Sequence, residues 1–130
     1  MFKRFVLAVV ATVLSFSAFA QFENPVSWSV KADKVEGNVY EIVLTGEITG
    51  EWHIYDLGPY IGGPIATTVT VAGEGVKVVG EPYIKTDVHR AYDEMFGMEI
   101  GTCDSGVQIA QKVEVTSADA VAAKVTVEWQ

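Results

Sequence analysis

The stretch that decides the fold alternates apolar and polar residues, and it runs Val107-Gln108-Ile109-Ala110-Gln111-Lys112-Val113-Glu114-Val115. A period of two is typical of a β-strand with one buried face. Residues 26–32, 40–45, 65–71 and 121–129 repeat it, and no segment of helix length has apolar residues three and four apart. About eight short strands separated by turn residues predict an all-β chain, and we expect an immunoglobulin-like β-sandwich. Trp28 and Trp52 are its expected large core residues.

The residues just before this stretch, Asp104-Ser105-Gly106, form a turn. Such a turn predicts a hairpin that joins the stretch to the strand before it. The only cysteine of the chain, Cys103, lies at the end of that strand and cannot form an internal disulfide. Its nearest charged neighbours in sequence, Glu99 and Asp104, are acidic and give no reason for a lowered thiol pKa. We therefore interpret Cys103 as a strand-end cysteine without a role.

Two patches carry bulkier side chains than the rest of the chain. One is Ala91-Tyr92-Asp93-Glu94-Met95-Phe96-Gly97-Met98-Glu99-Ile100, and the other is Glu51-Trp52-His53-Ile54-Tyr55. In one interpretation they are two strands whose apolar residues face the core and whose polar residues line the rim. In the other, aromatic and methionine side chains also form a surface where another protein docks. The residues alone leave both interpretations open.

The first twenty residues have the pattern of a secretory signal peptide. A basic start, Lys3-Arg4, precedes a mostly apolar run over residues 5–16, which ends in the small-residue pattern Ala18-Phe19-Ala20. Cleavage after Ala20 would leave one domain, residues 21–130, and we expect it in the periplasm. The apolar run is shorter than the roughly 20 residues that a membrane span needs, so we expect no membrane insertion of the mature chain.

The mature chain is strongly acidic. Removing Lys3 and Arg4 reduces the 9 basic residues to 7, against 17 acidic ones, so the net charge becomes −10. A nucleic-acid partner is therefore not expected.

No complete catalytic set is recognisable in the sequence. A hydrolase needs a nucleophile with a base and an orienting group, and neither His53 nor His89 lies in such a motif. Two histidines with scattered carboxylates do not make a zinc site, which takes three or four ligands. We expect no catalytic residue, no metal and no cofactor in this chain.

The order of several motifs makes the chain similar to a known family. These motifs are Trp28-Ser29, Glu51-Trp52-His53-Ile54-Tyr55, Gly63-Pro64, Tyr92-Asp93-Glu94-Met95-Phe96-Gly97-Met98, Gln111 and Val125-Thr126-Val127-Glu128-Trp129. In this order they resemble the periplasmic N-terminal domain of DsbD-type thiol:disulfide interchange proteins, also called the disulfide bond corrector domain. The resemblance covers nearly the whole mature chain.

The resemblance implies an immunoglobulin-like domain that passes electrons from a membrane-embedded donor to thioredoxin-fold proteins of the periplasm. It implies a partner-binding surface formed by Trp52, His53, Tyr55, Tyr92, Asp93, Phe96 and Met98. In the family a pair of cysteines follows the strand that corresponds to residues 125–129. No such pair is present here, so we expect a C-terminally incomplete domain that is inactive alone as a protein-disulfide reductase. A non-catalytic exported binding module remains the alternative function.

Overall fold

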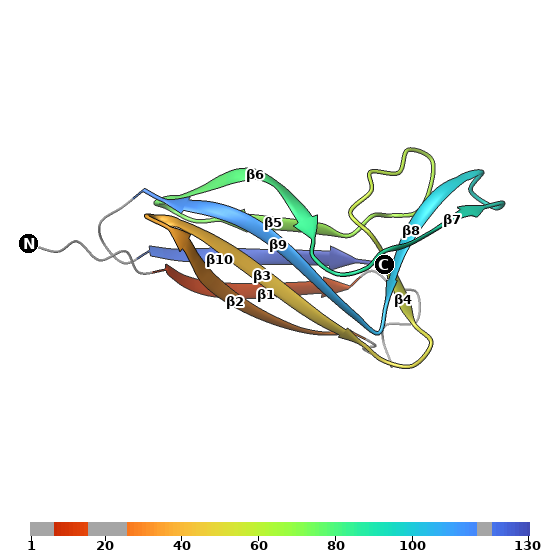
Figure 1. Cartoon of the computed structure of the whole chain (residues 1–130), viewed down its shortest axis with the longest axis horizontal. Helices are drawn as coiled ribbons and strands as arrows, with labels where there is room; N and C mark the ends of the chain where they lie inside the picture. Colours follow the sequence, from red (N-terminus) through yellow and green to blue (C-terminus); the bar gives the residue numbers. More distant parts are fainter. Residues whose placement is uncertain (1–6, 16–25, 117–120) are drawn as a thin grey trace, which may run out of the picture.

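The computed structural model describes residues 7–15, 26–116 and 121–130, and in this part of the chain every regular element is a β-strand (Figure 1). The prediction of an all-β sandwich is confirmed. Its strands are β1 (Leu7–Ser15), β2 (Val26–Glu36), β3 (Val39–Ile48), β4 (His53–Tyr55), β5 (Thr68–Ala72), β6 (Val76–Ile84), β7 (His89–Asp93), β8 (Met98–Asp104), β9 (Gly106–Val115) and β10 (Val121–Trp129).

The strands form three sheets. Two make the long body of the molecule: a four-stranded sheet in the order β2-β3-β9-β6 and a three-stranded sheet in the order β1-β10-β5. The third sheet, β4-β8-β7, is smaller, and Figure 1 shows it at the end of the body where β10 terminates. We call this third sheet the end sheet.

The body is held together by small and β-branched side chains from both of its sheets. Ile42 and Leu44 of β3 and Ile109 of β9 are buried from one side, and Val125 and Val127 of β10 from the other. Burying such side chains contributes about 1.5–3 kcal/mol each. The period of two in the sequence therefore marks the inward faces of β3, β9 and β10, but the strand predicted at residues 65–71 begins only at Thr68, and Ile65 is 58% exposed.

A polar side chain within this core, Gln111, fills an irregularity in the edge strand β6. The pairing of β6 with β9 shifts between Val79 and Tyr83, where Gly80 has a φ of 71°. The side-chain amide of Gln111 donates to the carbonyl oxygens of Val79 and Gly80, both at 3.2 Å, and to that of Lys112 at 2.9 Å. These bonds make the burial of the amide tolerable, because buried polar groups without partners are costly.

One predicted core tryptophan is placed differently by the structure. Trp28 packs partly buried against the core, with its ring centroid 5.6 Å from that of Trp129, which is buried. Trp52 instead lies in the turn before β4 and is 41% exposed, so the prediction of a core position for it was wrong. Its strand is only three residues long and begins after it, at His53.

The predicted hairpin around residues 104–106 is also absent from the observed pairing. β8 pairs with β4 and β7, whereas β9 pairs with β3 and β6, so the chain passes from the end sheet into the body at Ser105. Ser105 has a φ of 61°, and its carbonyl accepts a bond from the Ile48 amide at 2.8 Å. The single left-handed residue Ser105 changes the direction of the chain between β8 and β9. It does not form a hairpin, because the shortest common hairpin loops need two residues.

The predicted signal peptide overlaps the first strand. Leu7–Ser15 forms β1, which pairs in parallel with β10 along its whole length. β10 thus has partners on both sides in the full chain. The mostly apolar nine-residue strand β1 satisfies backbone hydrogen bonds by pairing with the edge of β10.

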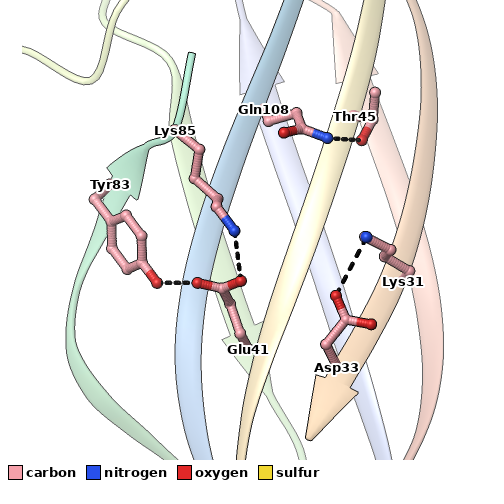
Figure 2. Close-up of polar contacts among 7 residues, drawn as sticks. All are labelled: Lys31, Asp33, Glu41, Thr45, Tyr83, Lys85 and Gln108. Carbon is pink, nitrogen blue, oxygen red and sulfur yellow. Dashed lines mark hydrogen bonds and ion pairs between the residues drawn. The ribbon is translucent and has the colours of Figure 1, made fainter. Parts of the chain in front are cut away.

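Polar contacts tie strands together on the outer face of the four-stranded sheet (Figure 2). The Glu41 carboxylate of β3 accepts hydrogen bonds from the Tyr83 hydroxyl and from Nζ of Lys85, with which it also forms an ion pair at 2.7 Å. These bonds join β3 to β6 and to the residue that follows β6. The bonds from Lys85 and Tyr83 hold the pKa of Glu41 below its usual value, and burial with the Glu41 bond raises that of Tyr83 to about 12. Thr45 and Gln108 bond across β3 and β9 at 3.3 Å.

Candidate functional site

The end sheet brings the two sequence patches onto one small scaffold. β8 is its central strand, with β4 paired on one edge and β7 on the other. Tyr55 stands opposite Thr102, and Tyr92 stands opposite Glu99. The Tyr55 amide also donates to the carbonyl of Gln130 at 3.3 Å, which fixes this sheet beside the end of β10.

The hairpin between β7 and β8 is fixed by Asp93. The carboxylate of Asp93 accepts from the Phe96 amide at 3.0 Å, and its carbonyl accepts from the Gly97 amide at 2.8 Å. Gly97 has a φ of 68°, which glycine adopts without steric cost. This local bonding of an Asp side chain is the ordinary device of a tight turn, and it leaves Met95 at the tip, 90% exposed.

The loop of residues 56–67 is anchored by the carboxylate of Asp56, which is buried. Its Oδ2 lies 3.0 Å from Nη2 of Arg90 on β7, and its Oδ1 accepts from the Gly58 amide at 3.1 Å and from the Tyr60 hydroxyl. The same hydroxyl accepts a bond from the Gly101 amide of β8 at 2.7 Å. We call Asp56, Tyr60, Arg90 and Gly101 the Asp56 network; it joins the loop to two strands of the end sheet.

Gly101 is needed where it stands because the Asp56 carboxylate lies directly over it. A Cβ on Gly101 would come within 2.3 Å of Oδ2 of Asp56 and 2.8 Å of Cγ1 of Val88. A second close contact occurs at Gly63, where a Cβ would lie 2.7 Å from Sδ of Met98. The loop therefore rests on β8 at two points, and the side chain of Ile61 between them is 91% exposed.

The surroundings of the Cys103 thiol make it unreactive. It is 1% exposed and belongs to the apolar core, beside Ile54 in the pairing of β4 with β8. Burial raises its pKa to about 11, and the negative charges of Asp56 and Asp104 add to this rise. Cys103 does lie at the end of its strand, one residue before β8 ends, but its side chain is in the core and the thiol stays protonated at neutral pH. Burial is also the main cause of the raised pKa of Tyr60, followed by its bond to Asp56.

The seven predicted partner-binding residues fall into two groups on opposite edges of β8. Trp52, His53 and Tyr55 lie at and before β4, where the rings of His53 and Tyr55 meet edge to face at 6.0 Å. Tyr92, Asp93, Phe96 and Met98 lie in the β7–β8 hairpin, and Tyr92 is 67% exposed. Both groups are in the end region, but β8 separates them, and Asp93 and Met98 have packing or turn contacts of their own.

Sequence reasoning missed the residues that join these groups. Asp56, Tyr60, Arg90 and Gly101 come from a loop and two strands, and none stands in a spacing that identifies a pair. One signal was available: an aspartate immediately after a strand, followed by Gly58-Pro59, is a typical beginning of a structured loop. Exposed acidic side chains surround the end sheet: Glu51, Glu94, Glu99 and Asp104.

Other kinds of site find no support in the described part of the chain. Residues 7–15, 26–116 and 121–130 contain no group of three or more side chains suited to hold a metal ion. The same residues include no helix with the length and apolar character to cross a membrane. In the comparisons with known proteins, no family model, no curated protein and no solved structure matches the chain.

Proposed function

We propose that this chain is an exported docking domain of the thiol:disulfide interchange type, with an immunoglobulin-like sandwich as its scaffold. It binds thioredoxin-fold proteins of the periplasm through the end sheet, within a relay that begins at a membrane electron donor. The observation that carries this proposal is the meeting of both aromatic patches in one small sheet beside the end of β10. The order of motifs that resembles the DsbD N-terminal domain supports the identity of the partner.

The exposed side chains of the end region support docking rather than simple packing. Ile61 and Met95 are the two most exposed large apolar side chains of the described chain. Ile61 lies in the loop that rests on Met98 at Gly63, and Met95 lies in the turn that precedes Met98. Tyr92 lies in the same hairpin as Met95 and is also largely exposed. Aromatic and methionine side chains of this kind are enriched at protein interfaces. The acidic rim around them favours a partner with basic residues at its own rim.

The chain itself supplies docking and no dithiol chemistry. Net reduction of a disulfide passes through a mixed disulfide that a second thiolate must resolve, and this sequence has one cysteine. The raised pKa and the burial of Cys103 also make it a poor first nucleophile. In an insulin-reduction assay we expect no turnover from this chain, and turnover that survives Cys103→Ser would contradict this expectation.

The docking proposal is tested by the affinity for a periplasmic thioredoxin-fold protein, measured by calorimetry. We expect binding that weakens at least about tenfold in a Tyr92→Ser, Met95→Ser double variant, because buried aromatic anchors dominate such interfaces. The matched control is Val35→Ser with Val78→Ser, which removes two exposed apolar side chains from the body. Equal weakening by both double variants, or no binding at all, would refute the proposal.

The alternative is a binding module for a ligand outside thiol chemistry, and the inert state of Cys103 favours it. In that case the thioredoxin-fold protein does not bind, while the end sheet still has the exposed side chains of a contact surface.

A further inference from the structure

The edge of β10 that faces β1 accepts a complete strand. β1 pairs there from Leu7 opposite Val121 to Ser15 opposite Trp129, without a bulge. Cleavage after Ala20 would remove β1 and leave the backbone amides and carbonyls of this edge without partners. An open edge of this kind is a template for another strand.

Two other open edges of the described body, those of β2 and β6, are less suited to pairing. β2 carries the charged residues Lys31 and Asp33 and has an irregularity between Lys34 and Glu36. β6 is interrupted between Val79 and Tyr83. β10, by contrast, alternates regularly, with Ala123, Val125, Val127 and Trp129 buried and only two charges on its outer face.

Those two charges make the edge complementary to itself. Lys124 is exposed and Glu128 is partly exposed, and they flank Thr126 at equal distances along β10. If two copies of β10 pair antiparallel with their Thr126 residues opposite each other, each Lys124 stands opposite Glu128 of the second copy. The same register places Val125 opposite Val127, so buried faces continue into buried faces. Opposite charges in directly facing positions stabilise a pair of strands.

We propose that the mature chain forms a two-fold symmetric dimer through antiparallel β10–β10 pairing centred on Thr126, and that β1 blocks this pairing before cleavage. The two β10–β5 pairs then form one four-stranded sheet across the dimer. This surface is different from the end sheet, so the proposal depends on the predicted cleavage and not on the docking of a thioredoxin-fold protein.

The first experiment compares the exported, processed protein with the uncleaved full chain by sedimentation. We expect a dimer for the processed form and a monomer for the full chain, with the amino terminus of each verified by mass spectrometry and the fold by circular dichroism. A processed form that is monomeric at every concentration up to the millimolar range overturns the proposal. So does export that leaves residues 1–20 attached, or a processed chain that is unfolded.

The second experiment tests the register by exchanging charges. With Lys124→Glu, the new carboxylate of each copy faces Glu128 of the other copy, so the dimer contains two repulsive pairs. We expect its dissociation constant to rise about tenfold. Lys124→Glu combined with Glu128→Lys restores the opposite pairs and should restore the affinity. A dimer that is insensitive to the single change, or not rescued by the double change, does not pair in this register.

The third experiment is a disulfide cross-link. In the proposed register the Cα atoms of the two Thr126 residues lie within the about 4.4–6.8 Å that a disulfide spans, so oxidised Thr126→Cys should form covalent dimers. Lys124→Cys is the matched control, because the two positions 124 are then too far apart to cross-link. Cys103 is buried and does not interfere. Cross-linking of both variants alike, or of the control alone, contradicts the register.

Discussion

The body of the sandwich and its end sheet are stabilised in different ways. In the body, side chains such as Ile42, Ile109 and Val125 fill a continuous apolar core between two sheets. In the end sheet, three strands of three to seven residues are held by the buried Asp56 carboxylate and its partners, and large apolar side chains remain in solvent. Stability thus comes mainly from the body, whereas the end sheet leaves large apolar side chains exposed.

The largest expected difference in the free energy of unfolding comes from replacing one isoleucine in each region. Ile109→Ala should lower the free energy of unfolding by about 3 kcal/mol, because it leaves a cavity in a close-packed core. Ile61→Ala in the end region should change it by less than about 0.5 kcal/mol, since that side chain is already in water. Urea denaturation of both variants measures the difference, and similar losses would show that the end loop is part of the folding core.

The next effect concerns the Asp56 network. Asp56→Asn should lower the free energy of unfolding by about 2 kcal/mol. If the oxygen of the new amide accepts from Gly58 and Tyr60, its NH₂ group faces the Arg90 guanidinium, so two donors oppose each other. The half-exposed Arg90 contributes the smaller part, since solvent screens its ion pair. Asp33→Asn, which breaks the exposed pair of Asp33 with Lys31, is the matched control and should cost less than about 0.5 kcal/mol. Native-state hydrogen exchange should locate the loss in residues 56–67 and β7, and a uniform loss would count against a separate end region.

Effects of similar or smaller size are expected at Cys103, where the end sheet joins the core. Cys103→Ala should cost about 1 kcal/mol near neutral pH through the lost contacts of the sulfur. Cys103→Ser should cost more, about 2 kcal/mol, because it places a hydroxyl among apolar side chains. If serine were as well tolerated as alanine, the thiol would lie in a more polar environment than the structure indicates.

The raised pKa of Cys103 gives a dependence on pH. The folded chain holds the thiol proton more tightly than the unfolded chain, so the resulting stabilisation is complete below about pH 9 and is lost as the pH rises through about 11. The stability gap between wild type and Cys103→Ala should therefore narrow over this range. Tyr60 and Tyr83 also have raised pKa values, but both are present in the two proteins and cancel in the comparison. A gap that stays constant to about pH 11 would contradict the burial of the thiol.

The sequence predicted the body far better than the end. The alternation at residues 107–115 and 121–129 marks strands whose inward face is buried in the core, and both segments are strands in the structure. The predicted hairpin at residues 104–106 is absent because the turn residues Asp104-Ser105-Gly106 carry the chain from one sheet to another, through the left-handed residue Ser105. The same residue types also form hairpin turns, so the sequence does not separate the two cases. The prediction that Trp52 is a core residue failed because Trp52 lies outside β4 and no strand directs its side chain into the core.

The candidate site was predictable only in part. Tyr92, Phe96 and Met98 stand out in the sequence by their bulk, and they do lie in one hairpin. The Asp56 network depends on contacts between residues more than thirty positions apart, such as Asp56 with Arg90, and on the space above Gly101. A single sequence does not indicate such a long-range pair.

We propose that the end sheet, and not the body, is the docking surface for a thioredoxin-fold protein. The most direct measurement is the map of backbone amide shifts when a periplasmic thioredoxin-fold protein is added to the isotope-labelled chain. We expect the shifts to concentrate in residues 52–64 and 90–100 and to disappear in the Tyr92→Ser, Met95→Ser variant. Shifts confined to the faces of the body, or a spectrum unchanged at saturating partner, would contradict the account.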